Sequence, residues 1–141
     1  MLLNNWSVFM KNLILGLSLI SILSSTSAFA GPREDLENEL KDDKKCLAIA
    51  TKAIDNKTYK VDWSQFNFKN QEEEAHASHV AHALDAYLGK LVNEKYDIKS
   101  ALSGKGKLYD EGYQRANDEY EYLKDLREDL SNSWSQAAFS L

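Results

Sequence analysis

The chain has 141 residues, of which 43% are hydrophobic and 28% are charged, and its formal net charge is −5. This length suits one globular domain and is too short for two independent cores. The chain contains no cluster of Lys and Arg that would offset this negative net charge. The charge therefore argues against nucleic-acid binding, because a negative surface repels phosphate backbones.

The first 30 residues have the pattern of a secretory signal peptide. Lys11 precedes the apolar run 13–23, and the sequence Ala-Phe-Ala at positions 28–30 supplies an A-x-A cleavage site. The apolar run is shorter than the roughly 20 residues that a membrane-spanning helix needs. We therefore expect an exported protein, periplasmic or secreted, with one helical domain over residues 31–141 and no membrane span after cleavage.

The first helix is predicted over residues 32–55. Pro32 fits a first helical position, and the acidic residues that follow it favour the positive end of the helix dipole. One face of this helix is apolar and carries Leu36, Leu40, Leu47, Ala50 and Ile54. Cys46, the only cysteine of the chain, lies at the flank of this stripe. Burial against a neighbouring helix is the first interpretation, and an intermolecular disulfide in a homodimer is the alternative.

The connection 57–70 is rich in aromatic residues. Tyr59, Val61 and Trp63 alternate along it as in an extended segment that closes one end of a bundle. Large aromatic side chains in a small domain usually fill the core. The alternative is an exposed aromatic patch centred on Trp63, because Trp and Tyr often anchor protein interfaces.

A second helix is predicted over residues 71–96. Asn70 and Glu73 have the spacing of an N-cap and its capping-box partner. The inner face of this helix is apolar and carries Val80, Leu84, Tyr87, Leu88 and Leu91.

The three histidines of the chain, His76, His79 and His82, all lie on this second helix. With about 100° between successive residues, His76 lies at the edge of the apolar stripe and the other two point away from it. The three side chains therefore do not converge on one point. Two neighbours could bind Zn²⁺ or Ni²⁺, but a tight site needs a further ligand from elsewhere. Their protonation at a pKa of about 6.5 would alternatively make a pH sensor.

The outward sector of the second helix is lined by small residues, namely Ala75, Ser78, Ala83, Ala86 and Gly89. A solvated helix more often carries Lys and Glu at such positions, and small residues let another chain approach closely. The predicted partner-binding surface therefore comprises Trp63, His79, His82 and Ala86.

The third and longest helix is predicted over residues 107–138, after a glycine-containing joint at 103–107. Apolar or aromatic residues recur in it at seven-residue spacing, namely Tyr109, Ala116, Leu123, Leu130 and Ala137. The opposite face is acidic and is expected to be solvated. Together the three helices predict an all-α fold, a three-helix bundle.

These patterns predict a small exported non-enzymatic protein that acts by binding another protein. Catalysis finds no support, because no nucleophile is evident beside a base and an orienting group. One alternative is a protein that binds a divalent metal, or senses metal or pH, through His76, His79 and His82. Another is a toxin-neutralising immunity protein or an enzyme inhibitor. The predicted architecture is common to all of these classes and diagnostic of none.

Overall fold

The computed structural model describes residues 31–139, and this part of the chain is helical without any strand. Its elements are α1 (Pro32–Leu40), α2 (Lys44–Asp55), the short 3-10 helix η2 (Trp63–Gln65), α3 (Gln71–Leu102) and α4 (Lys107–Phe139). The all-α class is confirmed. The predicted signal peptide at 1–30 lies outside the described residues. Within those residues, no helix combines the length and apolarity that crossing a membrane requires.

The predicted count of three helices is wrong, because the helix expected over 32–55 is two helices separated at residues 41–43. Asp43 has an extended backbone, with φ −128° and ψ 92°, and its side chain accepts the backbone N–H of Cys46 as the N-cap of α2. An Asp at this position satisfies a donor that the start of a helix leaves unpaired. The apolar stripe hid the break, since Leu40 and Leu47 keep a seven-residue spacing across it.

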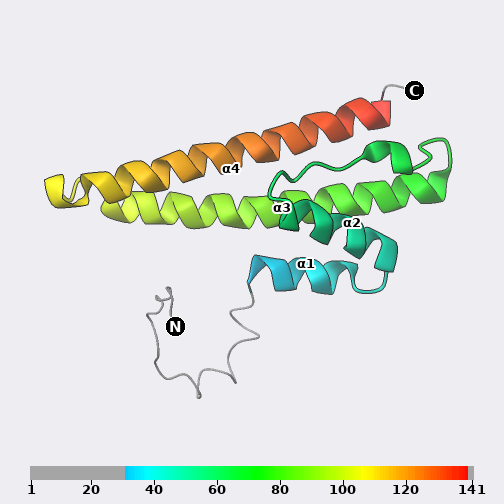
Figure 1. The fold of residues 1–141 in the computed structure, drawn as a ribbon, viewed down its shortest axis with the longest axis horizontal. Coiled ribbons are helices and arrows are strands. Elements are labelled where there is room, and N and C mark those ends of the chain that lie inside the picture. The colour runs from blue at the N-terminus through cyan, green and yellow to red at the C-terminus, as the bar shows by residue number, and fades with distance from the viewer. Residues whose placement is uncertain (1–30, 140–141) are drawn as a thin grey trace, which may run out of the picture. The chain divides into compact units, whose positions relative to one another are not determined.

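The two long helices, α3 and α4, are antiparallel and lie side by side, as Figure 1 shows. Gly104 and Gly106 in the turn between them have φ values of 72° and 102°, which favour glycine because it lacks a Cβ atom. The predicted joint at 103–107 is therefore a turn. The second predicted helix is longer than expected and ends at Leu102.

The start of α3 follows the predicted cap. The Oδ1 atom of Asn70 accepts the backbone N–H groups of Glu72 and Glu73. The capping-box partner acts differently from the prediction, because the carboxylate of Glu73 accepts the backbone N–H of Asn67. The cap therefore also fixes the last turn of the connection that enters α3.

The core lies where the two short helices and the connection 56–70 cover the first half of α3 (Figure 1). Its largest fully buried side chains are Leu40, Leu84, Leu88, Val80 and Cys46. Burial of Cys46 confirms the first interpretation of that residue. In α4 the seven-residue pattern is buried at Ala116 and Leu130, but Tyr109 is exposed.

The aromatic connection belongs to this core. Trp63 is only 6% exposed, its Nε1–H donates to the hydroxyl oxygen of Ser133 at 3.0 Å, and its ring centroid lies 5.3 Å from that of Trp134. Phe66 is buried beside it. The prediction of Trp63 as a partner contact is therefore corrected, because its ring has almost no surface left to offer a partner.

The end of the α3–α4 hairpin that carries the turn extends past α1 and α2 (Figure 1). We call residues 93–116 the hairpin arm. Several large apolar side chains are exposed on it, namely Tyr96, Ile98, Leu108 and Tyr109. In the rest of the described chain, the large hydrophobic side chains with comparable exposure are Tyr122 and Phe139.

Candidate functional site

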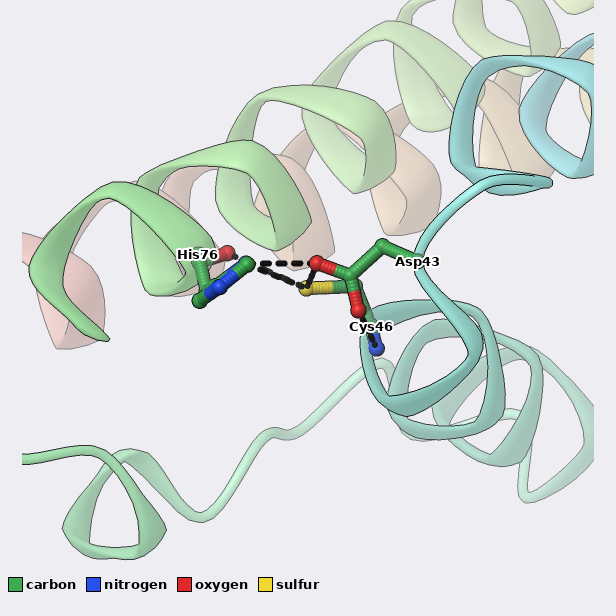
Figure 2. Close-up of side chains that lie close together, drawn as sticks. All are labelled: Asp43, Cys46 and His76. Carbon is green, nitrogen blue, oxygen red and sulfur yellow. Dashed lines mark hydrogen bonds and ion pairs between the residues drawn. The ribbon is translucent and has the colours of Figure 1, made fainter. Parts of the chain in front are cut away.

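The side chains of Asp43, Cys46 and His76 meet where the start of α2 faces the first turns of α3 (Figure 2). The Cys46 Sγ atom lies 3.0 Å from Oδ2 of Asp43 and 3.9 Å from Nδ1 of His76. The same Asp43 oxygen lies 2.5 Å from His76 Nδ1. Across residues 31–139, no other group of three or more His, Cys, Asp or Glu side chains brings its ligand atoms within 4.8 Å of one another.

The N-cap of α2 positions two members of this cluster. Asp43 Oδ1 accepts the backbone N–H of Cys46 at 3.1 Å, which brings the Cys46 side chain back over the carboxylate. His76 lies at the edge of the apolar stripe of α3, as predicted, and its side chain remains 44% exposed. The thiol sulfur also lies 3.5 Å from the backbone carbonyl oxygen of His76, an alternative acceptor for its single proton. The cluster therefore ties α2 to α3.

The charges of the cluster centre on the Asp43 carboxylate. Hydrogen bonds from the thiol and the backbone N–H of Cys46 lower the pKa of Asp43 below its usual value, and His76 adds to this effect. Burial, reinforced by the neighbouring carboxylate, raises the pKa of Cys46 to about 12. The short distance to His76 Nδ1 requires that this nitrogen donate a proton, since a carboxylate can only accept.

A catalytic role for Cys46 does not fit these surroundings. The reactive form of cysteine is the thiolate, but this thiol is protonated, fully buried and donates to a carboxylate. An activated cysteine would instead lie near positive charge and be open to solvent. What the cluster does offer is three ligand atoms of different chemistry: sulfur, imidazole nitrogen and carboxylate oxygen.

The three histidines have separate surroundings in the structure. His76 joins Asp43 and Cys46, whereas Nε2 of His79 lies 3.1 Å from the carboxylate of Glu39 in α1. His82 is exposed. The metal site predicted from His76, His79 and His82 thus retains only His76 in a ligand group.

Sequence reasoning missed Asp43 and Cys46 as members of the site. A signal for them was present, because Asp-x-x-Cys after Leu40 has the spacing of an N-cap and its third following residue. The pattern indicates a cap only where a helix begins at residue 44, and one continuous helix over residues 32–55 leaves Asp43 no such role. The link to His76 has no local signal at all, since that residue is on another helix.

The small-residue sector of α3 is only partly a free surface. Ala83 is buried and lines a pocket between α1 and α3 together with Leu36. Gly89 is buried too, and a Cβ atom there would lie 3.1 Å from the Arg127 guanidinium. The prediction that this sector points outward is therefore wrong at Ala83 and Gly89, where small size lets parts of the same chain approach.

The other residues of α3 that were predicted to contact a partner include Ala86 and His79, and both lie close to α1. Ala86 is exposed and lines the pocket between α1 and α3, next to the ion pair of Lys90 with Asp35. His79 is tied to α1 through Glu39. Much of the small-residue sector of α3 that was predicted to bind a partner therefore lies beside α1. Of the two histidines predicted as partner contacts, His82 is exposed, whereas His79 contacts Glu39.

Replacing Asp43 by Ala is expected to lower the free energy of unfolding at pH 7 by about 1–2 kcal/mol, because α2 loses its N-cap. Asp43→Asn should cost less, since Asn also caps helices. The carboxylate has a lowered pKa in the folded state, so its contribution is present above the unfolded-state pKa of about 3.9 and is lost as the pH falls further. Urea unfolding measures the free energy of unfolding of both proteins, with a chelator present so that no metal ion contributes. The difference between wild type and Asp43→Ala should become smaller below about pH 4. A difference in the free energy of unfolding that stays constant down to the lowest pH would contradict a stabilising role for the ionised carboxylate of Asp43.

The site thus combines a tether between two helices with a set of three ligand atoms, and it provides no accessible thiolate. The chain matches no protein-family model, no curated protein and no solved structure.

Proposed function

We propose that this is a small exported, non-enzymatic protein that acts by binding another protein through the hairpin arm. The observation that carries the proposal is the exposure of large apolar side chains on residues 93–116, above all Leu108, which is 86% exposed. Apolar side chains gathered on an exposed surface are typical of protein-interaction sites. Export is supported by the signal-peptide pattern of residues 1–30.

One exposed aromatic residue of the arm, Tyr96, is held in place by contacts with residues of α4 just beyond the arm. The rings of Tyr96 and Tyr120 lie 5.8 Å apart, and the ammonium of Lys99 lies 4.3 Å from the centre of the Tyr120 ring. Lys99 also donates to the side chain of Asn117 at 2.8 Å. At Tyr96 a partner would thus meet an ordered side chain, which would lose little entropy on binding.

The charge of the arm tip indicates the chemistry of the partner. Between residues 98 and 109 there are three lysines, Lys99, Lys105 and Lys107, and no carboxylate, although the whole chain is acidic. The exposed Leu108 and Tyr109 directly follow the last of these lysines. The tip therefore fits a protein segment in which apolar side chains alternate with carboxylates, because complementary charge favours encounter and register.

An anionic membrane surface fits the same tip less well. Asp97, Asp110 and Glu111 flank it and would repel anionic lipid headgroups. Three exposed large apolar side chains at the tip, Ile98, Leu108 and Tyr109, also give little area to insert into a bilayer. An immunity protein or an enzyme inhibitor would be one particular kind of the proposed protein binder.

The test compares two substitutions of equally exposed residues at opposite ends of α4. Leu108→Glu places a carboxylate on the arm, and Phe139→Glu does the same at a side chain that is 85% exposed. The tagged full chain and both variants are expressed in the native cell, and the proteins that co-purify are quantified by mass spectrometry. A partner should be recovered with wild type and Phe139→Glu and reduced at least tenfold with Leu108→Glu, since burying an unpaired charge in a contact costs about 2 kcal/mol or more.

The partner identified in this way is then purified and titrated against each protein. Equal helical melting temperatures for the three proteins would show that Leu108→Glu acts on binding. Retention of the partner by Leu108→Glu, or equal loss with both variants, would contradict the role of the arm. Binding to anionic lipid vesicles that disappears with Leu108→Glu, with no protein partner, would replace the protein by a membrane surface.

A further inference from the structure

We infer that Asp43, Cys46 and His76 form a binding site for a divalent metal ion of the zinc class, held between the start of α2 and the first turns of α3. This goes beyond the proposed protein binding, which uses the opposite end of the hairpin. It also differs from the site predicted on α3 alone, because two of its three ligands come from α2. The observation behind it is the convergence of the three ligand atoms within 4.8 Å.

The ligand chemistry selects the class of metal. Thiolate sulfur, imidazole nitrogen and carboxylate oxygen are the three side-chain ligands that zinc uses in proteins. Magnesium and calcium prefer sets made of oxygen atoms alone. A set containing sulfur and nitrogen therefore favours Zn²⁺, and Co²⁺ is a suitable spectroscopic substitute.

The distances fit a tetrahedral ion after a small adjustment. Zinc bonds of about 2.0–2.3 Å place neighbouring ligand atoms of a tetrahedron about 3.4–3.6 Å apart. The observed separations are 2.5 Å from Asp43 Oδ2 to His76 Nδ1, 3.0 Å from Cys46 Sγ to the same oxygen, and 3.9 Å from Cys46 Sγ to the nitrogen. Moving that carboxylate oxygen away by roughly 1 Å would bring its two distances into the range of zinc. The sulfur and nitrogen atoms, now 3.9 Å apart, would also have to approach each other by about 0.3 Å.

The surroundings of the ligands are compatible with an ion. Asp43 uses Oδ1 to cap α2 and leaves Oδ2 for the metal, so the cap holds the ligand in place. Such hydrogen bonds to ligating groups are a regular feature of metal sites. His76 is 44% exposed and gives a route from solvent, from which water can supply the fourth ligand.

The charge balance is also favourable. When the ion binds, the Cys46 thiol releases its proton to solvent, and the proton on Nδ1 of His76 moves to Nε2 in the neutral ring or to solvent in the doubly protonated ring. The two negative charges of the Asp43 carboxylate and the Cys46 thiolate then neutralise a divalent cation. The ion thus replaces the proton between sulfur and carboxylate, and it adds a cross-link between α2 and α3.

The experiment uses the purified, reduced and metal-free full chain, titrated with Zn²⁺ by calorimetry and with Co²⁺ by absorption. We expect one ion per chain, a thiolate-to-cobalt charge-transfer band, and a rise in melting temperature with Zn²⁺. Cys46→Ala should abolish the band, and His76→Gln should weaken Zn²⁺ binding at least tenfold. His82→Gln is the matched control, since it removes an exposed histidine from the same helix, and it should change nothing.

Three outcomes would overturn the inference. The first is the absence of Zn²⁺ binding to the wild-type chain. The second is a cobalt spectrum without a thiolate band, or one that persists in Cys46→Ala. The third is binding that is lost with His82→Gln and retained with His76→Gln, which would place the ion on the surface histidines. If Cys46→Ala does not fold, the comparison of His76→Gln with His82→Gln still decides.

Discussion

Replacing Trp63 by Ala is expected to lower the free energy of unfolding by about 3–5 kcal/mol, the range for deleting a large buried aromatic side chain. Trp63 joins the connection 56–70 to α4 through its packing on Trp134 and its hydrogen bond to Ser133. Its loss leaves a cavity and weakens the attachment of the connection to α4, where Phe68 still packs on Trp134. Denaturant unfolding followed by helical circular dichroism measures the change.

Two further variants make this result specific. Trp63→Phe keeps an aromatic ring but removes the Nε1–H donor, so it should cost clearly less than Trp63→Ala. Tyr122→Ala removes an aromatic side chain that is exposed, and it should stay within about 0.5 kcal/mol of wild type. A Trp63→Ala protein as stable as wild type would show that this ring is not part of the core. The exposed aromatic patch would then again be the better interpretation of the connection.

Replacing Leu84 by Ala should lower the free energy of unfolding by about 2–5 kcal/mol, because a fully buried leucine leaves a cavity that the surroundings fill only in part. Leu108→Ala is its matched control: the same change at an exposed residue should alter stability by no more than about 0.5 kcal/mol. The two variants distinguish a leucine that stabilises the fold from one that is proposed to bind a partner. Leu84→Ala should lower the stability, whereas Leu108→Ala should weaken only the binding of the partner. Equal losses of stability would mean that the arm is packed against something in the folded chain.

The cap of α3 and its inner face were predictable because both depend on local geometry. Asn70 can accept the first N–H groups of a helix whatever the rest of the chain does. Val80, Leu84 and Leu88 share one face through the helical repeat alone, and the structure buries all three. The glycine turn before α4 was predictable for the same reason.

The break between α1 and α2 shows where periodicity fails. The apolar residues keep their spacing through residues 41–43, so the pattern by itself favours one helix. The hydrogen bonds that Asp43 accepts from the backbone N–H and the thiol of Cys46 favour two separate helices instead. Whether such a cap operates depends on whether the separated helices can both pack on α3, which is a property of the assembled core.

The sequence by itself determined the helical class, the cap of α3, its buried face and the turn at 103–107, since these follow from backbone hydrogen bonding and from a repeat of 3.6 residues. Only the tertiary structure decided which side chains meet. Cys46 and His76 are 30 positions apart, and no repeat within one helix relates them. The same holds for Ala83 and Gly89, whose small side chains looked open to a partner until α1 and Arg127 were found beside them. A helix presents its faces according to its own sequence, but what covers each face depends on how the other helices pack against it.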